Sequence, residues 1–238
     1  MDLVGIVSLE SRRGRRPAVT EERLLGLRLL RAEVPVSPRL REAGRCRRAA
    51  RGAAALYRAG VRRALTAPDF PCWPVLEEQG LRPVETEGFC QAIAVPLALA
   101  GLRRAGILRR QAVVALAGPR VSRPLFAAAE RLCPQVRHLV VDVPGGEGEE
   151  LAAWLREEYG AAVLAAEAAE PALTLAFGPG GGTRGTVLRL YGPKPELAGL
   201  TPQPAEGALP PELAPLPLLA LLWECGRLPV EQIRISAT

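Results

Sequence analysis

The sequence predicts a three-layer α/β fold with a mainly parallel sheet, built as two α/β halves. Short apolar runs rich in valine and leucine alternate with helical patterns along most of the 238 residues, which is typical of parallel α/β layering. Many of these runs are continuously apolar, as expected of strands that are covered on both faces. We therefore expect sheets buried between other layers.

The composition is that of a globular chain with a small-residue core. Hydrophobic residues make up 48% and aromatic residues only 4%, so leucine, valine and alanine must fill the interior. The formal net charge is +6, and Lys194 is the only lysine among 31 basic residues. This arginine bias, with its many Ala, Gly and Pro residues, is typical of a GC-rich genome and does not by itself indicate a nucleic-acid partner.

The first half should alternate strands with helices. Its expected strands are residues 4–9, 61–67 and 81–85. Thr20 and the following EERLLGLRLLRAE predict a capped helix with a face of leucines, because glutamates fill its first turn. A second helix is expected from about Pro38 to Gly60. The long apolar segment from Glu87 predicts a buried helix that Pro96 kinks or splits.

The second half repeats the alternation more regularly. Its expected strands are residues 111–118, 136–143, 161–165, 172–178 and 186–192. Helices are expected in SRPLFAAAERL and GEELAAWLREEYG, the second with one apolar stripe. GPGGGTRG (178–185) predicts a flexible hairpin, because so few linking residues do not suffice for a parallel crossover. The alternative is an adaptable lid with Arg184 facing a ligand.

Residues 111–132 form a candidate phosphate-binding unit. A strand runs through QAVVALAG into a turn and then a helix, which resembles the mononucleotide half of a Rossmann fold. In that family a glycine signature lets the pyrophosphate approach the helix N-terminus, and only its first glycine, Gly118, is present here. The following positions carry side chains, among them Val121 and Arg123, where the backbone must approach the ligand.

The same turn has groups that bind an anion in another way. Arg120, Ser122 and Arg123, together with the amides at the helix start, predict a site for a phosphate or carboxylate. Asp142 ends the next strand, where dinucleotide-binding domains place the acid that accepts the ribose hydroxyls. The candidate binding residues are therefore Gly118, Arg120, Ser122, Arg123 and Asp142, and a plain strand-to-helix turn is the alternative.

The order of elements resembles the shikimate dehydrogenase family in outline. That family has a smaller α/β domain and a linking helix before a Rossmann-like domain, and VETEGF (84–89) is similar to its threonine-acid-glycine stretch. The family's catalytic lysine and aspartate pair has no counterpart here, since Lys194 lies far downstream in a proline-rich segment. The resemblance therefore implies no catalytic residue.

These segments predict the domain limits. They are an N-terminal α/β layer at 1–87, a linking helix at 88–108, a Rossmann-like domain at 109–192, and a C-terminal stretch at 193–238. The last stretch should begin as a proline-rich surface connection and end in a helix and a strand that dock on the body.

Several chemistries lack the residues that they need. The single histidine, His138, is expected at the start of a strand, far from the carboxyl ends where sites form. The five cysteines form no C-x-x-C pair, so we expect free thiols, no disulfide framework and no metal site. Segment 144–150 carries glutamates that would repel phosphate and instead stabilise a helix N-terminus.

The chain should be cytoplasmic and without membrane contact. Its apolar runs fall short of the roughly 18 residues of a membrane span, and its start has no signal-peptide pattern. Two arginine-rich runs, 11–16 and 39–51, have the charge to attract polyanions. They lack the interleaved aromatic residues of single-strand binders, so we do not expect a nucleic-acid partner.

We therefore expect a degenerate Rossmann-like binding or regulatory protein without classical dehydrogenase chemistry, with a small anionic ligand as its partner. The alternative is an NAD(P)- or phospholigand-dependent enzyme that uses a divergent loop at 118–123, with Asp142 selecting the ribose. A third class, a nucleic-acid binder using Arg12 to Arg16 and Arg45 to Arg51, ranks below both.

Overall fold

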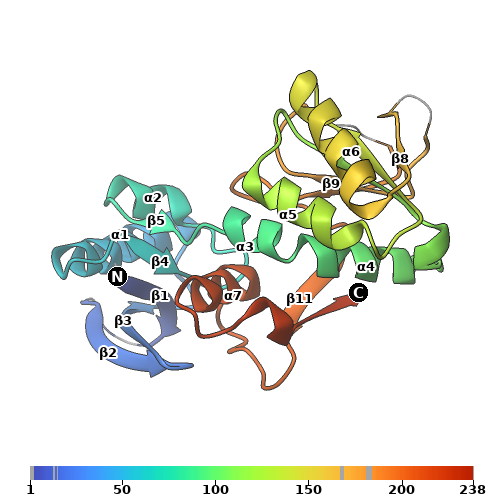
Figure 1. The fold of residues 1–238 in the computed structure, drawn as a ribbon. Coiled ribbons are helices and arrows are strands. Elements are labelled where there is room, and N and C mark those ends of the chain that lie inside the picture. The colour runs from blue at the N-terminus through green and yellow to red at the C-terminus, as the bar shows by residue number, and fades with distance from the viewer. Residues whose placement is uncertain (1–2, 13, 15, 167–168, 181–183, 238) are drawn as a thin grey trace. The chain divides into compact units, whose positions relative to one another are not determined.

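The computed structural model describes residues 3–12, 14, 16–166, 169–180 and 184–237 (Figure 1). The chain forms two compact units: unit 1 is Met1–Glu85 with Glu206–Pro229, and unit 2 is Thr86–Ala205 with Val230–Thr238. Each unit contains one five-stranded sheet, which confirms the predicted α/β class. Within the described residues, no helix has both the length and the apolar character that crossing a bilayer requires.

The sheet of unit 1 is mainly parallel and has the strand order β2-β3-β1-β4-β5. Its strands are β1 (Val4–Ser11), β2 (Ala18–Leu24), β3 (Leu27–Val36), β4 (Arg63–Leu65) and β5 (Arg82–Pro83). β1 runs parallel to β3 and to β4, and β4 runs parallel to β5. Only β2 is antiparallel to its neighbour, β3.

Helices cover both faces of this sheet. α1 (Glu42–Arg58) and α2 (Trp73–Glu78) pack on one face, in a buried cluster that includes Val34 and Ala64. Gly52 lets α1 come close, because a Cβ there would lie 2.6 Å from Cγ2 of Val34. Arg63 precedes Ala64 and so points to the opposite face, where it pairs with Glu224 of α7 (Pro215–Glu224) at 2.7 Å.

The helix predicted for residues 21–33 is wrong, because this segment is the β2–β3 hairpin. Leu25 and Gly26 form its two-residue turn, with φ of 48° and 78°. Both values lie in the left-handed region that the tightest hairpin turns require. Leu27 and Leu29 are buried on β3 with an exposed residue between them. The leucines that suggested a helical face therefore follow the two-residue period of strands.

The sheet of unit 2 is wholly parallel and has the strand order β10-β9-β6-β7-β8. Its strands are β6 (Val113–Ala117), β7 (His138–Asp142), β8 (Val163–Leu164), β9 (Leu173–Ala176) and β10 (Thr186–Arg189). All five fall within the predicted runs. Counted from the first strand of the unit, the order is that of the Rossmann fold.

Helices cover one face of this sheet, and connecting chain covers the other. The helices α4 (Ala94–Arg104), α5 (Arg123–Leu132) and α6 (Gly146–Tyr159) lie side by side (Figure 1). Gly101 brings α4 onto the sheet, because a Cβ there would lie 2.5 Å from Cδ1 of Leu173. On the opposite face, Ala166 and Ala169 of the β8–β9 connection pack against Ala115. The parallel sheet is thus enclosed on both sides.

The long helix predicted from Glu87 is split into α3 (Glu87–Ala92) and α4, with Ile93 between them. Pro96 has no N–H to donate to the carbonyl of Ala92, so one continuous helix would lose a hydrogen bond at this point. This confirms the expected effect of Pro96.

Residues 178–185 do not form the predicted hairpin. β10 pairs parallel with β9, with Thr186 opposite Leu173, so the connection carries the chain back along the sheet. A short connection suffices because strands of four residues span only about 13 Å. Arg184 donates to the carbonyls of Ala166 and Ala169, and so its side chain holds the layer of connecting chain in place. Residues 181–183 lie outside the described residues.

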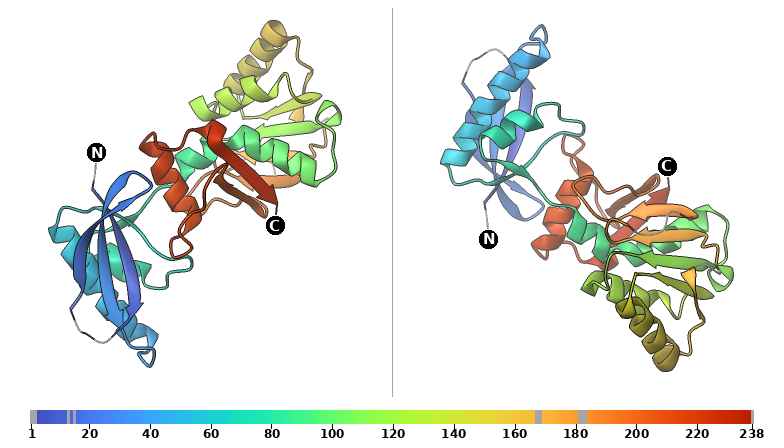
Figure 2. Two further views of the ribbon diagram at one scale, coloured as in Figure 1. Left: turned by 90° about the horizontal axis from the view of Figure 1, so that it is seen from below. Right: turned by 90° about the horizontal axis from the view of Figure 1, so that it is seen from above.

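The proline-rich stretch contains a strand that the sequence did not predict. β11 (Leu200–Pro204) pairs antiparallel with the predicted last strand, β12 (Ile233–Ala237), and this two-stranded ribbon lies against α4 (Figure 2). Ala205 N–H donates to the carbonyl of Gln232 at 2.7 Å. Bonded N–H groups alternate along an antiparallel strand, and Pro202 and Pro204 lie at the positions between them. Their missing N–H groups therefore leave the ladder intact.

A disulfide joins Cys46 of α1 to Cys72 at the start of α2, which corrects the expectation that all cysteines are free. The two Cα atoms lie 5.0 Å apart although 26 residues separate the cysteines in sequence. No spacing pattern reveals this pair, because the packing of α1 beside α2 creates it. Cys90, Cys133 and Cys225 remain free thiols.

The conformation of the β2–β3 turn predicts whether a substitution at Gly26 raises or lowers stability. Gly26→Ala should lower the free energy of unfolding by about 1 kcal/mol, because alanine is strained at a φ of 78°. If the segment were the helix that its leucines indicate, the same change would raise stability by about 1 kcal/mol. Urea unfolding followed by circular dichroism decides between the two, and Leu25→Asn should stabilise only the hairpin.

The disulfide predicts a thiol count and a reductant effect. Unfolded, unreduced protein should titrate three thiols, and reduced protein five. Reduction should lower the free energy of unfolding by about 3 kcal/mol, since it releases a cross-link across 26 residues. The matched control is the Cys46→Ala/Cys72→Ala double variant, whose stability should not respond to reductant. Five thiols without reductant would contradict the pairing.

Candidate functional site

The carboxyl edge of the sheet of unit 2 is where a ligand site is expected. Open parallel sheets bind ligands outside the carboxyl ends of their strands, where the strand order reverses. In unit 2 this point lies between β6 and β9, which are followed by Gly118 and Phe177. The predicted residues lie at this edge, since Asp142 ends β7 beside β6 and residues 118–123 follow β6.

Protein atoms fill the point where the strand order reverses. Phe177 is 7% exposed, and its N–H donates to the carbonyl of Ala117 at 2.8 Å, which extends the sheet beyond the strands. Pro119 lies so close to Gly178 that a Cβ on that glycine would be 2.6 Å from Cδ of the proline. The backbone here therefore faces Pro119, where a pyrophosphate would need open space.

The start of α5 has few amides left for an anion. Ser122 is its N-cap, and Oγ of this serine accepts a hydrogen bond from Leu125 N–H at 3.4 Å. Pro124 has no N–H, so only the Arg123 amide remains among the first three positions of the helix. Inside the first turn of α5, the free amides expected from the sequence are thus reduced to that of Arg123.

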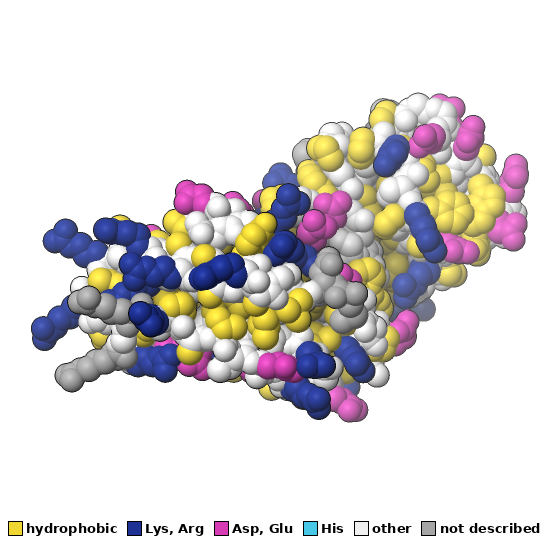
Figure 3. All heavy atoms as spheres, turned by 90° about the vertical axis from the view of Figure 1, so that its left-hand side faces the viewer, with side chains coloured by type: hydrophobic (Ala, Val, Ile, Leu, Met, Phe, Trp, Pro, Cys, Tyr) yellow, Lys and Arg dark blue, Asp and Glu magenta, His cyan; other side chains and the backbone are white. Residues whose placement is uncertain are grey.

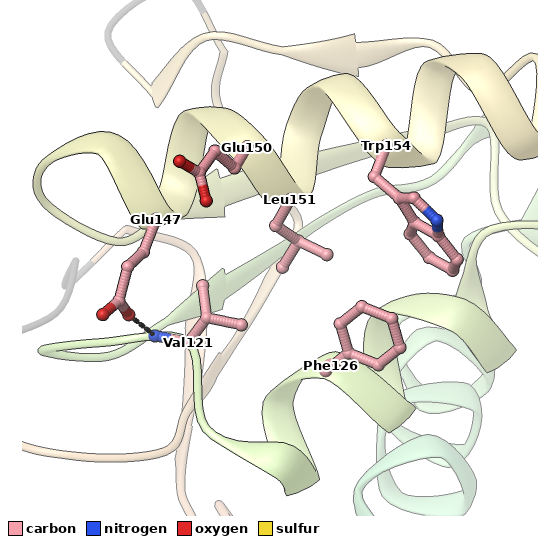
Figure 4. Close-up of a pocket in the computed structure, with 6 residues that line it drawn as sticks. All are labelled: Val121, Phe126, Glu147, Glu150, Leu151 and Trp154. Carbon is pink, nitrogen blue, oxygen red and sulfur yellow. Dashed lines mark hydrogen bonds between the residues drawn. The ribbon is translucent and has the colours of Figure 1, made fainter.

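A carboxylate of the protein itself is bonded to the loop before α5. Glu147, in the first turn of α6, accepts a hydrogen bond from Val121 N–H at 2.8 Å (Figure 4). The same carboxylate lies at the positive end of the α6 dipole, the role that the sequence indicated. Its bond to the loop was missed, because no local pattern connects residues that are 26 positions apart.

The predicted arginines are the open part of this edge. Arg120 and Arg123 are exposed, and within the described residues neither guanidinium has a hydrogen-bond or ion-pair partner. Gly118 has a packing role, because a Cβ there would lie 3.3 Å from Cδ1 of Leu125. Asp142 is half-buried, and its carbonyl accepts the N–H of Gly118 at 3.2 Å. The edge therefore presents side chains to a ligand instead of a backbone cradle.

A pocket of about 320 Å³ opens beside the loop, between α5 and α6. Its lining consists of Val121, Phe126, Glu147, Glu150, Leu151 and Trp154 (Figure 4). The rings of Phe126 and Trp154 contact each other at an angle of 37° with centroids 4.8 Å apart, and the two carboxylates come from the start of α6. Aromatic faces and carboxylates both disfavour a phosphate, so the lining of this pocket does not suit one.

α3 closes the edge near β9 and β10. Glu87 accepts hydrogen bonds from the N–H of Gly192 (2.9 Å) and from Nε2 of Gln91 (3.2 Å). Gln91 also donates to the carbonyl of Phe177 at 3.5 Å. Glu87 belongs to the stretch that resembles the shikimate dehydrogenase segment, and here its carboxylate holds loops of the sheet edge together.

Neither Cys90 nor His138 supplies a reactive group at this edge. Burial, with a smaller contribution from Glu87, raises the pKa of the Cys90 thiol to about 12, so it stays protonated. His138 begins β7 at the amino edge of the sheet, as predicted. Among the described residues, no group of three or more His, Cys, Asp or Glu side chains is placed to hold a metal ion.

The sheet of unit 2 has the strand order and the parallel pairing of a Rossmann-like α/β fold. No protein-family model and no curated protein sequence matches the chain. Among solved structures, L-tryptophan dehydrogenase from Nostoc punctiforme is similar with 14% identity and a TM-score of 0.30. The match covers 62% of this chain but only 44% of that protein, and at this TM-score it carries no argument about function.

The bond between Val121 and Glu147 predicts unequal effects of two neighbouring glutamates. Glu147→Ala should lower the free energy of unfolding by about 1 kcal/mol, because the loop loses a charge-assisted hydrogen bond at an exposed position. Glu150→Ala, on the same helix and also exposed, should change it by less than about 0.5 kcal/mol. Urea unfolding measures both values. Faster hydrogen exchange of the Val121 amide in the Glu147→Ala variant alone would show that the lost stability comes from this hydrogen bond. Equal losses of stability in the two variants would contradict the prediction.

Proposed function

We propose that this chain is a Rossmann-like binding or regulatory protein without classical dehydrogenase chemistry. The observation that carries the proposal is the hydrogen bond from Val121 N–H to the Glu147 carboxylate. In dinucleotide-binding domains the amides of this loop receive the pyrophosphate. Here a fixed negative charge already accepts one of them, and it repels a second anion that approaches the same amide.

Two further features support the absence of a dinucleotide. Pro119 packs on Gly178 where the strand order reverses, which leaves the pyrophosphate no close approach to the backbone. The start of α5 has only the Arg123 amide left among its first three positions. Both features follow from residues of this loop, so they restrict the ligand without changing the fold.

The ligand that we propose for this edge is a small anion held by side chains. Arg120 and Arg123 are exposed, and a guanidinium can hold a carboxylate or phosphate through two parallel hydrogen bonds. The Ser122 hydroxyl uses a lone pair to cap α5, so its O–H remains free to donate. Such a site selects charge and size more than the identity of the whole ligand, which fits a sensor better than a catalyst.

One observation favours the alternative of an NAD(P)- or phospholigand-dependent enzyme. Asp142 ends the strand next to β6, the position from which this fold binds a ribose. For a dinucleotide to bind there, Glu147 would have to release Val121, and Pro119 would have to leave Gly178. The two functions therefore differ in which ligand stabilises the protein.

Thermal unfolding with ligands separates these functions. We expect millimolar NAD, NADP, ATP and S-adenosylmethionine to leave the Tm unchanged, whereas inorganic phosphate and citrate raise it. A ligand at 100 times its Kd stabilises by about 2.7 kcal/mol, which is easily measured. Because phosphate also stabilises proteins through exclusion from their surface, the readout is the part of the shift that Arg120→Ala/Arg123→Ala removes.

The matched control is Arg110→Ala/Arg131→Ala, which removes two exposed arginines elsewhere in unit 2 and should keep the full shift. Stabilisation by NAD that is lost in Asp142→Asn would overturn the proposal in favour of the enzyme. Equal shifts in the wild type and both double variants would contradict the assigned loop.

A further inference from the structure

The two arginine runs of the sequence meet at one end of unit 1. Arg48 of α1 donates to the carbonyls of Gly14 (3.0 Å) and Pro35 (2.6 Å), which fastens the loop after β1 to α1. Basic side chains crowd this part of the molecule in Figure 3. The arginine surface, as we name it, consists of Arg12, Arg16, Arg39, Arg41, Arg45, Arg47, Arg48 and Arg51. Residues 13 and 15 of the first run lie outside the described residues.

The positive charge of the chain is concentrated in unit 1. By sequence, this unit carries 18 basic and 13 acidic side chains, whereas unit 2 carries 13 and 12. On the described arginine surface, only Arg12 has a carboxylate partner, Glu33, at 3.4 Å. α1 contains one acidic residue, Glu42. The arginines of this surface are therefore largely unneutralised.

The arginine surface is hollowed at the carboxyl ends of β1 and β3. A pocket of about 450 Å³ lies there, and its polar lining comes from Ser11, Arg12, Ser37 and Arg48. Two hydroxyls and two guanidinium groups are donors that suit a phosphate group. The carboxyl edge of parallel strands is also where α/β sheets place their ligands.

Exposed arginines continue from the pocket along α1. Arg47, Arg51 and Arg58 recur at intervals of four and seven residues, so they share one face of the helix over about 16 Å. Nε of Arg47 donates to the carbonyl of Ala43, which fixes this side chain along the helix. A single small anion cannot occupy a row of this length together with the pocket. Successive phosphates of a polymer can.

We propose that the arginine surface binds the sugar-phosphate backbone of a nucleic acid, with one phosphate in the pocket and others along α1. Guanidinium groups suit phosphates because they offer two parallel hydrogen bonds. The described lining of the pocket contains no aromatic ring, so recognition rests on phosphates instead of stacked bases and does not depend on base sequence. This site is independent of the anion site proposed for unit 2.

The sequence alone argued against this partner, because its two runs looked like separate solvated segments without aromatic residues. In the folded unit the two runs are no longer separate. Runs that a hairpin separates in sequence become one surface, and Arg48 fixes their relative position. The lack of aromatic residues excludes base stacking, but it does not weaken binding to a backbone.

The proposal is tested by fluorescence anisotropy of the full chain with a labelled 20-base-pair DNA duplex and with an RNA duplex of the same sequence. With about four phosphate contacts, affinity should fall roughly 100-fold between 50 and 200 mM salt. Arg41→Ala/Arg47→Ala/Arg51→Ala should weaken binding at least tenfold at 100 mM salt. It should also make the negative slope of the log association constant against log salt concentration shallower by two to three. Arg47 and Arg51 are exposed positions inside α1, where alanine favours a helix, and Arg41 is an N-cap whose side chain makes no capping bond, so α1 should persist.

The control variant Arg103→Ala/Arg110→Ala/Arg131→Ala removes the same charge from exposed positions of unit 2 and should bind like the wild type. Equal weakening by both triple variants would reduce the effect to net charge and overturn the site. Retention on heparin or on anionic vesicles without binding to either duplex would overturn the nucleic-acid assignment. The single Arg51→Gln variant, expected to weaken binding about threefold, keeps the test valid if the triple variant unfolds.

Discussion

Close packing of helices on parallel strands is the constraint on which both units depend. With 4% aromatic residues, the core is filled by small and medium side chains, so helices and sheets must approach closely to exclude water. Gly52 against Val34 in unit 1 and Gly101 against Leu173 in unit 2 provide this approach. Once α4 is fixed on β9, α3 is fixed beside the carboxyl edge, where Glu87 binds the loop at Gly192.

At the carboxyl edge of unit 2, we propose that a few contacts exclude nucleotides from a fold that commonly binds them. The strand order places a turn and a helix where a phosphate would bind, but Pro119 fills the approach and Glu147 takes the Val121 amide. These contacts satisfy groups that would otherwise need water or a ligand. Under this proposal the chemistry of the loop, and not the fold, decides which ligand the edge accepts.

The sequence predicted those elements whose signals are local. Every strand of the five-stranded sheet of unit 2 fell in a predicted run, and Pro96 broke its helix, because apolar runs and missing N–H groups act on neighbouring residues. The β2–β3 hairpin was missed because the spacing of its leucines fits both a helix and a strand. In addition, Leu25 takes a left-handed conformation that is usual for glycine. The disulfide and the bond between Val121 and Glu147 join residues 26 positions apart, which no local pattern reports. The roles of Gly118, Arg120, Ser122, Arg123 and Asp142 in binding stay predictions.

Anion recognition can rest on backbone amides or on side chains, and the two leave different traces in a sequence. An amide cradle needs glycines at fixed spacing, so its absence can be recognised in a sequence. Here Gly118 is the one glycine of the signature that is present, and in the structure the carboxylate of Glu147 accepts a hydrogen bond from the loop. A guanidinium surface needs no spacing, only a fold that gathers its members, as Arg48 gathers the runs of unit 1. The strand-turn-helix pattern therefore lies in the nearly neutral unit, whereas the excess positive charge and the hollow with phosphate-suited donors belong to unit 1. Under the two proposals, the distribution of unneutralised charge in each folded unit, more than the glycine pattern, determines which anion each unit binds.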